Sequence, residues 1–321
     1  MAKQILIGIS GWRYPPWRQV FYPKGLIQKR ELEFASQALP TIELNGSFYA
    51  LQRPSSYLSW YEQTPPDFVF SIKATRYITH ILRLENIETA LANFFASGLL
   101  ALKEKLGPVL WQFPPSFRFD AALFENFLKQ LPHDTEAAAK LAEKRDATMH
   151  NREFIKADQK RALRHAVEIR NKSFEVPEFI TLLRKYNVAL VIADTAGKWP
   201  DNQDITADFT YLRLHGAEEL YASGYTDKAL DHWAARIDAW SKGSQPEDAK
   251  LVSEEAPTQR KSRDVYCYFD NDIKVKAPFD ARKLLRRLDL ESGLRELDWS
   301  HADEPGELNP TKARGKAKPA K

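Results

Sequence analysis

Eight short apolar segments of strand length leave this 321-residue chain few folds to adopt. Most of them are rich in β-branched or aromatic residues, which favour strands, and helical patterns separate most of them. Strands that alternate with helices indicate parallel βαβ units, and eight such units predict a single closed (β/α)8 barrel of the TIM type. The predicted strands are residues 4–10, 41–45, 68–74, 108–113, 165–170, 188–194, 209–215 and 265–271.

The connections between these segments predict one irregularity in an otherwise regular α/β fold. Helical patterns cover residues 28–38, 55–63, 86–106, 119–131, 136–145, 177–186, 227–240 and 278–288, with Asn86 as an expected N-cap. Residues 195–207, between the sixth and seventh strands, have no helical period. Because a parallel crossover needs about a dozen residues, this connection is expected to be irregular or very short.

Composition bounds the domain organisation and the compartment. We expect a barrel domain over residues 1–302, with polar surface segments at 135–160 and 241–263, and a basic tail over 303–321 that is predicted to be disordered. The single cysteine, Cys267, favours a reducing cytoplasm. No apolar segment is long enough to span a membrane and no signal peptide is evident, so no membrane partner is expected.

Polar residues gather at the carboxyl ends of the predicted strands, where active sites of such barrels lie. Three pairs have the i, i+2 spacing that places both side chains on one face of a strand: Glu43 with Asn45, Glu168 with Arg170, and Arg213 with His215. Lys73, Gln112, Asp194 and the sequence Asp270–Asp272 occupy equivalent positions. Because buried charges are costly unless paired, a purely structural ion network remains open as an alternative to a functional site.

The residue types at these positions suit acid–base or metal-assisted chemistry. The catalytic candidates are Glu43, Lys73, Glu168, Asp194 and His215, and Glu43, Glu168, Asp194 and His215 are also the candidates for a divalent metal site. Arg170, Arg213 and Lys73 could clamp an anionic group. Trp12, Tyr14 and Tyr225 lie in loops that follow strands, where aromatic faces beside arginine suit sugar rings or nucleobases. His165, at the start of the fifth strand, is expected to be structural.

The chain resembles the YecE-like family, also called domain of unknown function 72. The matching stretches run from residue 5 to about 290, and they are GISGWRYPPWR, IELNGSFY, FSIKA, GPVLWQFPPSF, RHAVEIRNKSF, YLRLHG, YASGY and VYCYFDND. The resemblance implies a TIM-type barrel, and it marks Tyr49, Gln112 and Asn271 along with the strand-end residues already named. Phe174 stands where the family pattern has Trp, a departure that would alter stacking in the barrel mouth.

These observations predict an enzyme, of the hydrolase, lyase or isomerase kind, that acts on a small polar substrate, sugar-like or phosphorylated. The expected substrate-binding residues are Trp12, Tyr14, Asn45, Tyr49, Gln112, Arg170, Arg213, Tyr225 and Asn271. The alternative is a nucleic-acid-binding or processing protein that uses the aromatic and basic mouth and the basic tail. A barrel that binds a ligand without catalysis is the third reading. The sequence leaves the cofactor open, with a divalent metal ion as the candidate.

Overall fold

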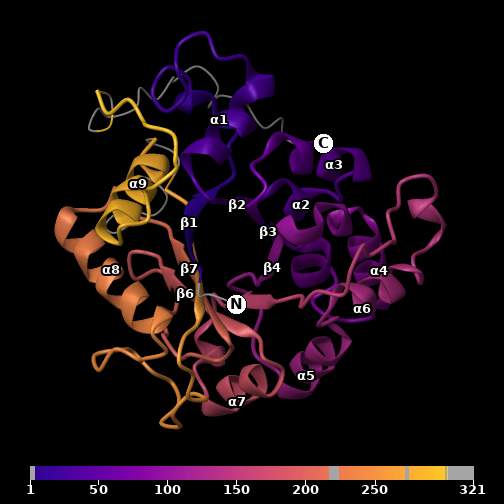
Figure 1. Ribbon diagram of the computed structural model, residues 1–321. Helices are drawn as coiled ribbons and strands as arrows, with labels where there is room; N and C mark the ends of the chain where they lie inside the picture. The colour runs from indigo at the N-terminus through magenta and orange to yellow at the C-terminus, as the bar shows by residue number, and fades with distance from the viewer. Residues whose placement is uncertain (1–3, 217–223, 272–274, 301, 303–321) are drawn as a thin grey trace, which may run out of the picture.

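The protein is a closed barrel of eight parallel strands in the order of the chain, with helices around it (Figure 1). The computed structural model describes residues 4–216, 224–271, 275–300 and 302. The predicted (β/α)8 fold is confirmed. The strands are β1 (Ile5–Ser10), β2 (Thr41–Leu44), β3 (Val69–Lys73), β4 (Leu106–Gln112), β5 (His165–Glu168), β6 (Ala189–Asp194), β7 (Phe209–Leu214) and β8 (Asp264–Phe269).

Helices cover the outside of the barrel, and α8 and α9 lie side by side (Figure 1). Asp120 and Asp134 begin α5 and α6 by accepting hydrogen bonds from the backbone N–H groups of Leu123 and Ala137, as N-cap residues do. The α-helices are α1 (Glu31–Ala38), α2 (Gly46–Tyr49), α3 (Pro54–Gln63), α4 (Glu88–Ala96), α5 (Ala121–Gln130), α6 (Thr135–Ala142), α7 (Pro177–Lys185), α8 (Asp227–Ser241) and α9 (Ala277–Arg287).

Two connections test the sequence prediction in opposite ways. The single helix predicted over 86–106 is wrong, because α4 ends before Gly98, whose φ of +119° is open to glycine, and a 3₁₀ segment, Leu99–Lys105, follows. Asn86 is not the N-cap; that position is Ile87, and Asn86 has a φ of +49°. Between β6 and β7 the prediction is confirmed, since residues 195–208 contain no helix.

Tyrosine side chains form a floor across the middle of the barrel interior. The rings of Tyr211 on β7 and Tyr268 on β8 lie 5.2 Å apart, and their hydroxyls contact Ser71 and Thr41. Gly8 of β1, which pairs in register with Tyr268, lets β1 lie close to β2, because a Cβ there would lie 1.9 Å from the carbonyl oxygen of Thr41. The floor separates an apolar lower barrel from the polar residues at the carboxyl ends of the strands.

The main apolar core lies between the outer face of the strands and the helices. Phe174 belongs to it, fully buried and packed against Phe117, Phe119 and Phe179. The sequence prediction that Phe174 alters stacking in the barrel mouth is therefore wrong, since its partners are core rings. His165 also has a structural place, because its ring contacts the carbonyl oxygen of Pro132 and accepts from the indole of Trp111. Within the described residues, no helix has the length and apolar character that crossing a membrane requires.

Candidate functional site

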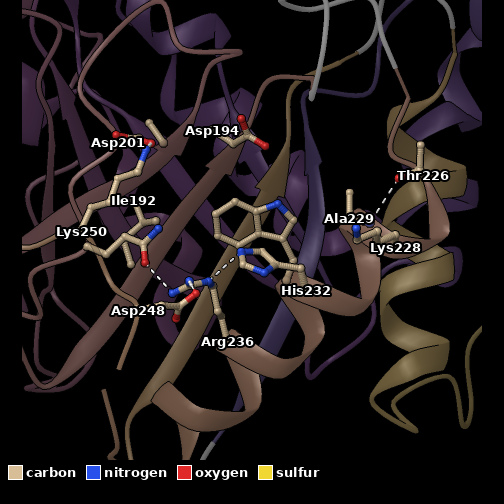
Figure 2. Close-up of a pocket in the computed structure, with 13 residues that line it drawn as sticks. Ile192, Asp194, Asp201, Thr226, Lys228, Ala229, His232, Arg236, Asp248 and Lys250 are labelled. Carbon is tan, nitrogen blue, oxygen red and sulfur yellow. Dashed lines mark hydrogen bonds and ion pairs between the residues drawn. The ribbon is translucent and has the colours of Figure 1, made fainter. Parts of the chain in front are cut away.

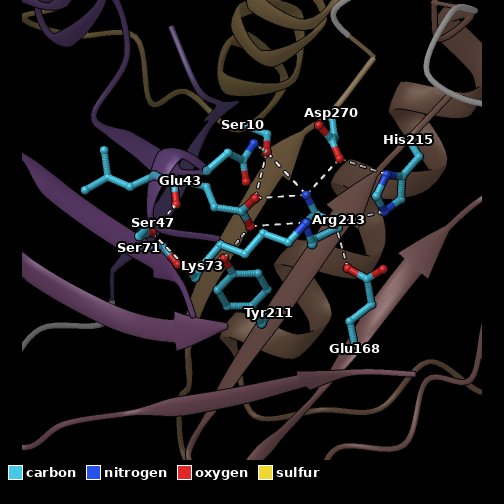
Figure 3. Close-up of polar contacts among 12 residues, drawn as sticks. Ser10, Glu43, Ser47, Ser71, Lys73, Glu168, Tyr211, Arg213, His215 and Asp270 are labelled. Carbon is cyan, nitrogen blue, oxygen red and sulfur yellow. Dashed lines mark hydrogen bonds and ion pairs between the residues drawn. The ribbon is translucent and has the colours of Figure 1, made fainter. Parts of the chain in front are cut away.

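A buried charged centre surrounds Arg213 of β7 at the carboxyl ends of the strands (Figure 3). The Arg213 side chain is 0% exposed and donates to three carboxylates: to Glu43 at 2.9 and 3.1 Å, to Glu168 at 2.7 Å and to Asp270 at 2.7 Å. Burial alone would lower the pKa of Arg213, but these carboxylates hold it well above its usual value. The charged centre consists of Ser10, Glu43, Glu168, Arg213, His215 and Asp270.

Glu43 joins the charged centre to the tyrosine floor. Its two carboxylate oxygens accept from Ser10 Oγ at 2.6 Å and from the hydroxyl of Tyr211 at 2.7 Å, besides the two contacts with Arg213. Burial, and then the charge of Glu43, raise the pKa of Tyr211 well above its usual value, so that hydroxyl stays a donor. The carboxylate is therefore fully satisfied by its neighbours, as a buried charge must be to be tolerated.

Glu168 of β5 stands between two arginines. Arg213 donates to its Oε2, and Arg170 donates to its Oε1 at 2.7 Å. Burial would raise the pKa of Glu168, but Arg170 and Arg213 outweigh it and hold the pKa well below its usual value. The guanidinium of Arg170 also lies 3.8 Å from the ring centre of Trp199, a cation–π contact with the irregular β6–β7 connection. That connection thus reaches back to the barrel mouth.

His215 is held within the charged centre rather than facing the solvent. The side chain is 0% exposed, with Nδ1 3.1 Å from Asp270 Oδ2 and Nε2 3.4 Å from Arg213 Nη1. Because an arginine can only donate, Nε2 is the acceptor in its contact with Arg213. Asp270 is buried, yet Arg213 and His215 hold its pKa well below its usual value. The pair supports the position of Arg213.

Lys73 of β3 contributes a cation to the same face with a different environment. Its side chain is 9% exposed, and Nζ lies 4.3 Å from the ring centre of Phe48. No hydrogen bond or ion pair with another described residue reaches Nζ. Burial, and then the charge of Arg213, lower the pKa of Lys73 to about 8, against the opposing effect of Glu168 and Glu43. Lys73 is therefore a nearly buried amine that titrates close to neutral pH.

A small cavity beside the charged centre is lined partly by the aromatic loop that follows β1. Its volume is about 270 Å³, and its walls include Trp12, Tyr14, Asn45, Gln52 and Trp60. Asn45 donates from Nδ2 to Ser10 Oγ at 2.7 Å, and the Tyr14 hydroxyl donates to the carbonyl oxygen of Ser10. The predicted residues Trp12, Tyr14 and Asn45 thus share one cavity, which Ser10 connects to Glu43.

Two other predicted residues lie apart from these groups. Gln112 is buried at the end of β4, paired in register with Glu168, and its Nε2 donates to the carbonyl oxygen of Phe113 at 2.6 Å. Tyr49 is 73% exposed and its ring contacts that of Phe48 edge-on at 5.1 Å. Tyr49 therefore lies on the outside of the rim, where it contacts the same ring that covers Lys73.

Asp194 was expected to face the barrel mouth with the other polar residues at the strand ends, but Asp194, Tyr225 and Asn271 do not face the charged centre. They form an outer cluster with Asp280 of α9, on the opposite side of the barrel wall. The Tyr225 hydroxyl donates to Asp194 at 3.0 Å, while the Tyr225 backbone and Asn271 Nδ2 donate to Asp280 at 3.1 and 2.9 Å. Burial raises the pKa of Asp194, and it raises that of Asp280 to about 6, against the hydrogen bond from Asn271.

A larger cavity of about 560 Å³ opens next to this outer cluster, between β6, the helix-free connection and α8 (Figure 2). Four of its charged residues form two ion pairs, Arg236 with Asp248 and Lys250 with Asp201. Arg236 donates to His232 at 2.7 Å, to Gln203 at 2.7 Å and to Asp248 at 2.6 Å, while Lys250 contacts Asp201. Burial and then the charge of Arg236 lower the pKa of His232. The cavity lies where a regular barrel would have its sixth crossover helix.

The residues proposed as metal ligands do not fit a metal ion in this arrangement. The guanidinium of Arg213 occupies the space between Glu43 and Glu168, and Asp194 lies beyond the barrel wall. Among residues 4–216, 224–271, 275–300 and 302, no group of three or more His, Cys, Asp or Glu side chains is arranged to hold a metal.

Comparison with known proteins places the chain in a family. A family profile described as "Protein of unknown function DUF72" matches residues 6–305. The chain belongs to the DUF72 family. The resemblance inferred from the sequence motifs is thereby confirmed.

Curated proteins resemble this chain in sequence, and a solved DUF72 structure resembles it in fold. UPF0759 protein YunF of Bacillus subtilis (strain 168) is 24% identical, over 92% of this chain and 99% of that protein. UPF0759 protein YecE of Escherichia coli (strain K12) is also 24% identical, over 75% and 84%. The crystal structure of a DUF72 family protein from Thermotoga maritima MSB8 aligns with a TM-score of 0.68 at 22% identity, covering 89% of this chain and 99% of that one. At this identity the structural likeness shows the fold.

Sequence reasoning on this DUF72 chain missed three residues that the structure places at the site: Ser10, Tyr211 and Trp60. Ser10 and Tyr211 belong to or support the charged centre, and Trp60 walls the small cavity. Asp270 was recognised as a strand-end residue but not as a candidate site residue, and it binds Arg213. The predicted basic tail, residues 303–321, lies outside the described residues, so the nucleic-acid alternative that depends on it stays a prediction.

Proposed function

We propose that this DUF72 protein is an enzyme that binds a small polar substrate through an anionic group, such as a phosphate or carboxylate, at the carboxyl-end rim of the barrel. The observation that carries this proposal is Lys73. It is a nearly buried cation whose Nζ has no hydrogen-bond or ion-pair partner among the described residues, while the neighbouring Glu43, Glu168 and Asp270 all bind Arg213.

The environment of Lys73 suits two roles in one reaction. The protonated amine can hold an anionic group of the substrate. Because its pKa is lowered to about 8, the amine can also lose its proton near neutral pH and act as a general base. Arg170 and Asp270 reach solvent at the same rim, with side-chain exposures of 12% and 13%, and are the other groups that a substrate would meet.

The other members of the charged centre would not contact the substrate but would hold Arg213 in place. Glu43 and His215 are fully buried, and Glu168 is bound on both oxygens by arginines. They fix Arg213 and hold the local charge, so in this proposal they are positioning residues. Their burial also supports the ion-network alternative, which predicts that substrate binding has nothing to do with Lys73. The experiment must therefore separate stability from binding.

Lys73→Met separates the two, because the methionine fills similar space without the charge. In a buried site the lowered pKa of Lys73 means that the ammonium costs up to about 3 kcal/mol of folding free energy near neutral pH. The variant should be more stable than the wild type at pH 7. It should also lose the thermal stabilisation that inorganic phosphate, citrate or a panel of sugar phosphates gives to the wild type.

Lys105→Met is the matched control. Lys105 is equally buried, but its Nζ donates to the carbonyl oxygens of Tyr61 and Thr64 and to Thr64 Oγ1. Its loss should lower stability and leave anion binding unchanged.

Anions that stabilise the wild type should then be screened as substrates, with NMR to detect the products. The reaction rate should vary with pH as expected for one titrating group of pKa near 8. Unchanged anion binding in Lys73→Met would reject the proposal.

A further inference from the structure

The small cavity walled by Trp12, Tyr14, Asn45, Gln52 and Trp60 carries hydrogen-bonding groups that the protein itself does not use. Trp12 is 7% exposed, and its indole Nε1 is a buried donor with no acceptor among the described residues. Asn45 Oδ1 is a buried acceptor with no donor among them. An unsatisfied buried polar atom costs free energy, and Trp12 and Asn45, which both carry one, line the same cavity, where a ligand could supply the missing partners.

The orientation of the Asn45 amide follows from the charged centre. Glu43 can only accept, so the single proton of the Ser10 hydroxyl goes to Glu43 Oε1. Ser10 Oγ must then accept from Asn45, which fixes Nδ2 toward Ser10 at 2.7 Å. This leaves Oδ1 of Asn45, a residue of the cavity wall, without a donor among the described residues. Asn45 is therefore held as an acceptor for an incoming donor.

The walls of the cavity constrain the shape of the ligand. The rings of Trp12 and Trp60 stand 5.7 Å apart at 84°, so they form a corner rather than two parallel plates. The two rings therefore leave no slot in which a flat nucleobase could stack on both sides, and a ligand meets them from one side of the corner. The volume of about 270 Å³ lies below the usual range for drug-sized ligands, and it suits one ring.

The chemistry of the unused groups points to hydroxyls. A ligand hydroxyl accepts from one neighbour and donates to another, so one hydroxyl, or two on adjacent carbons, satisfies both the Trp12 indole N–H and the Asn45 carbonyl oxygen. Gln52 donates from Nε2 to the carbonyl oxygen of Ala50, which leaves Oε1 as a further acceptor at the same wall. Arg13 lines the cavity as well, and aromatic walls with amide and arginine side chains suit a polyhydroxylated ring.

We propose that this cavity is a subsite for one uncharged sugar ring. The inference deepens the proposed function, and it rests on that function only for the link to the charged centre. That link is Ser10, whose hydroxyl contacts both Asn45 and Glu43. A sugar at the subsite would place the remainder of the substrate at the rim near Lys73, the amine proposed to take the anionic group.

The test is calorimetric titration of the full-length protein with free monosaccharides and their methyl glycosides, and with nucleosides as the competing class. At least one sugar should bind with a dissociation constant in the range of about 0.1 to 10 mM. Trp12→Phe keeps the aromatic ring and removes only the N–H, and it should weaken that binding by about tenfold.

Trp240→Phe is the matched control. Trp240 on α8 is fully buried, and its Nε1 also has no partner among the described residues, but it does not line the cavity. Its replacement should leave sugar binding unchanged. Three results would overturn the inference: no sugar binds, nucleosides bind and sugars do not, or Trp12→Phe and Trp240→Phe bind sugar equally well.

The same titrations distinguish this inference from the proposed function. Inorganic phosphate binding that is lost in Lys73→Met but kept in Trp12→Phe supports the anion site, whatever the sugars do. Sugar binding that is lost in Trp12→Phe but kept in Lys73→Met supports the subsite, whatever the anions do. A sugar phosphate should bind more tightly than either part and should be weakened by both substitutions.

Discussion

The charged centre and the outer cluster both lie at the carboxyl-end rim of the barrel, yet burial and neighbouring charges shift the pKa values of their carboxyl groups in opposite directions. In the charged centre the pKa values of Glu168 and Asp270 are held well below their usual values, because arginines and His215 outweigh burial. In the outer cluster burial raises the pKa values of Asp194 and Asp280, because their close donors are neutral hydroxyl, amide and backbone groups.

At the end of β8, two adjacent residues belong to the two different regions. Asp270 faces the barrel interior and binds Arg213, while the next residue, Asn271, faces outward and binds Asp280. Successive side chains of a strand point to opposite faces, so adjacent residues enter unlike environments. Burial costs a charge similarly on both sides; what separates the two regions is the presence of a cation.

The largest effect should come from removing that cation. Arg213→Met leaves Glu43, Glu168 and Asp270 buried without their counter-charge and should lower the free energy of unfolding by about 5 kcal/mol, as measured by urea denaturation. Arg213→Lys, which keeps the charge but not the fork geometry, should lose less.

Arg236→Met is the control for arginine burial. Its guanidinium is buried too, but its carboxylate partner, Asp248, is 74% exposed, so the cost should be nearer about 2 kcal/mol. If Arg213→Met were no less stable than Arg236→Met, the charged centre would not differ from an ordinary surface pair.

Asp280→Asn should show that the ionised carboxylate of Asp280 destabilises the folded protein. The folded pKa of Asp280 is raised from 3.8 to about 6, so its favourable contribution is present below the unfolded pKa and is lost as pH rises through about 6. The stability of the variant relative to the wild type should therefore increase by up to about 3 kcal/mol between about pH 4 and pH 8. Urea denaturation across pH measures this, and a flat difference would contradict it.

Glu168→Gln should behave in the opposite way with pH. The pKa of Glu168 is lowered, so its stabilising contribution is present above the unfolded pKa of about 4.5 and is lost as pH falls through the folded value. At neutral pH the variant should lose about 2 kcal/mol, since Arg213 keeps Glu43 and Asp270. Stability that holds, combined with weaker anion binding, would instead indicate that Glu168 contacts the ligand directly.

Tyr225→Phe should have the smallest effect. It removes a hydroxyl that donates to Asp194 and accepts from the backbone N–H of Gly216 at 3.1 Å. A loss of about 1.5 kcal/mol is expected, because one of the two lost hydrogen bonds goes to a carboxylate, and such bonds contribute at least about that much. A loss as large as that of Arg213→Met would show that the outer cluster is not the weakly coupled region described above.

Much of the fold was predictable from the sequence, because βαβ alternation and strand composition recur in every unit. The charged centre was predictable where two polar residues share a face, as Glu43 with Asn45 and Arg213 with His215 do. The exception within the helices, the break at Gly98, depends on close packing of that glycine against Pro54 and Tyr57, which no local pattern contains.

The placement of Asp194 and Asn271 was not predictable for a physical reason. Strands of a closed parallel barrel are covered by helices outside and filled inside, so both faces read as apolar. On β6, Val191 faces the interior and Ile192 the helices, and nothing in the sequence VALVIAD distinguishes the two. A single polar residue at the end of such a strand can therefore face either way, and only the closed barrel decides.

The enclosure of Arg213 also has a spectroscopic consequence. Its guanidinium is out of contact with solvent, lies above the Tyr211 floor and donates from Nε and both Nη nitrogens. Exchange of these protons with water should be slow enough that the Nε–H of Arg213 gives a persistent, strongly shifted side-chain NMR signal at neutral pH. Exposed arginines exchange too fast to show one. The protein thus contains its own probe, which would report any ligand that loosens the contacts of Arg213.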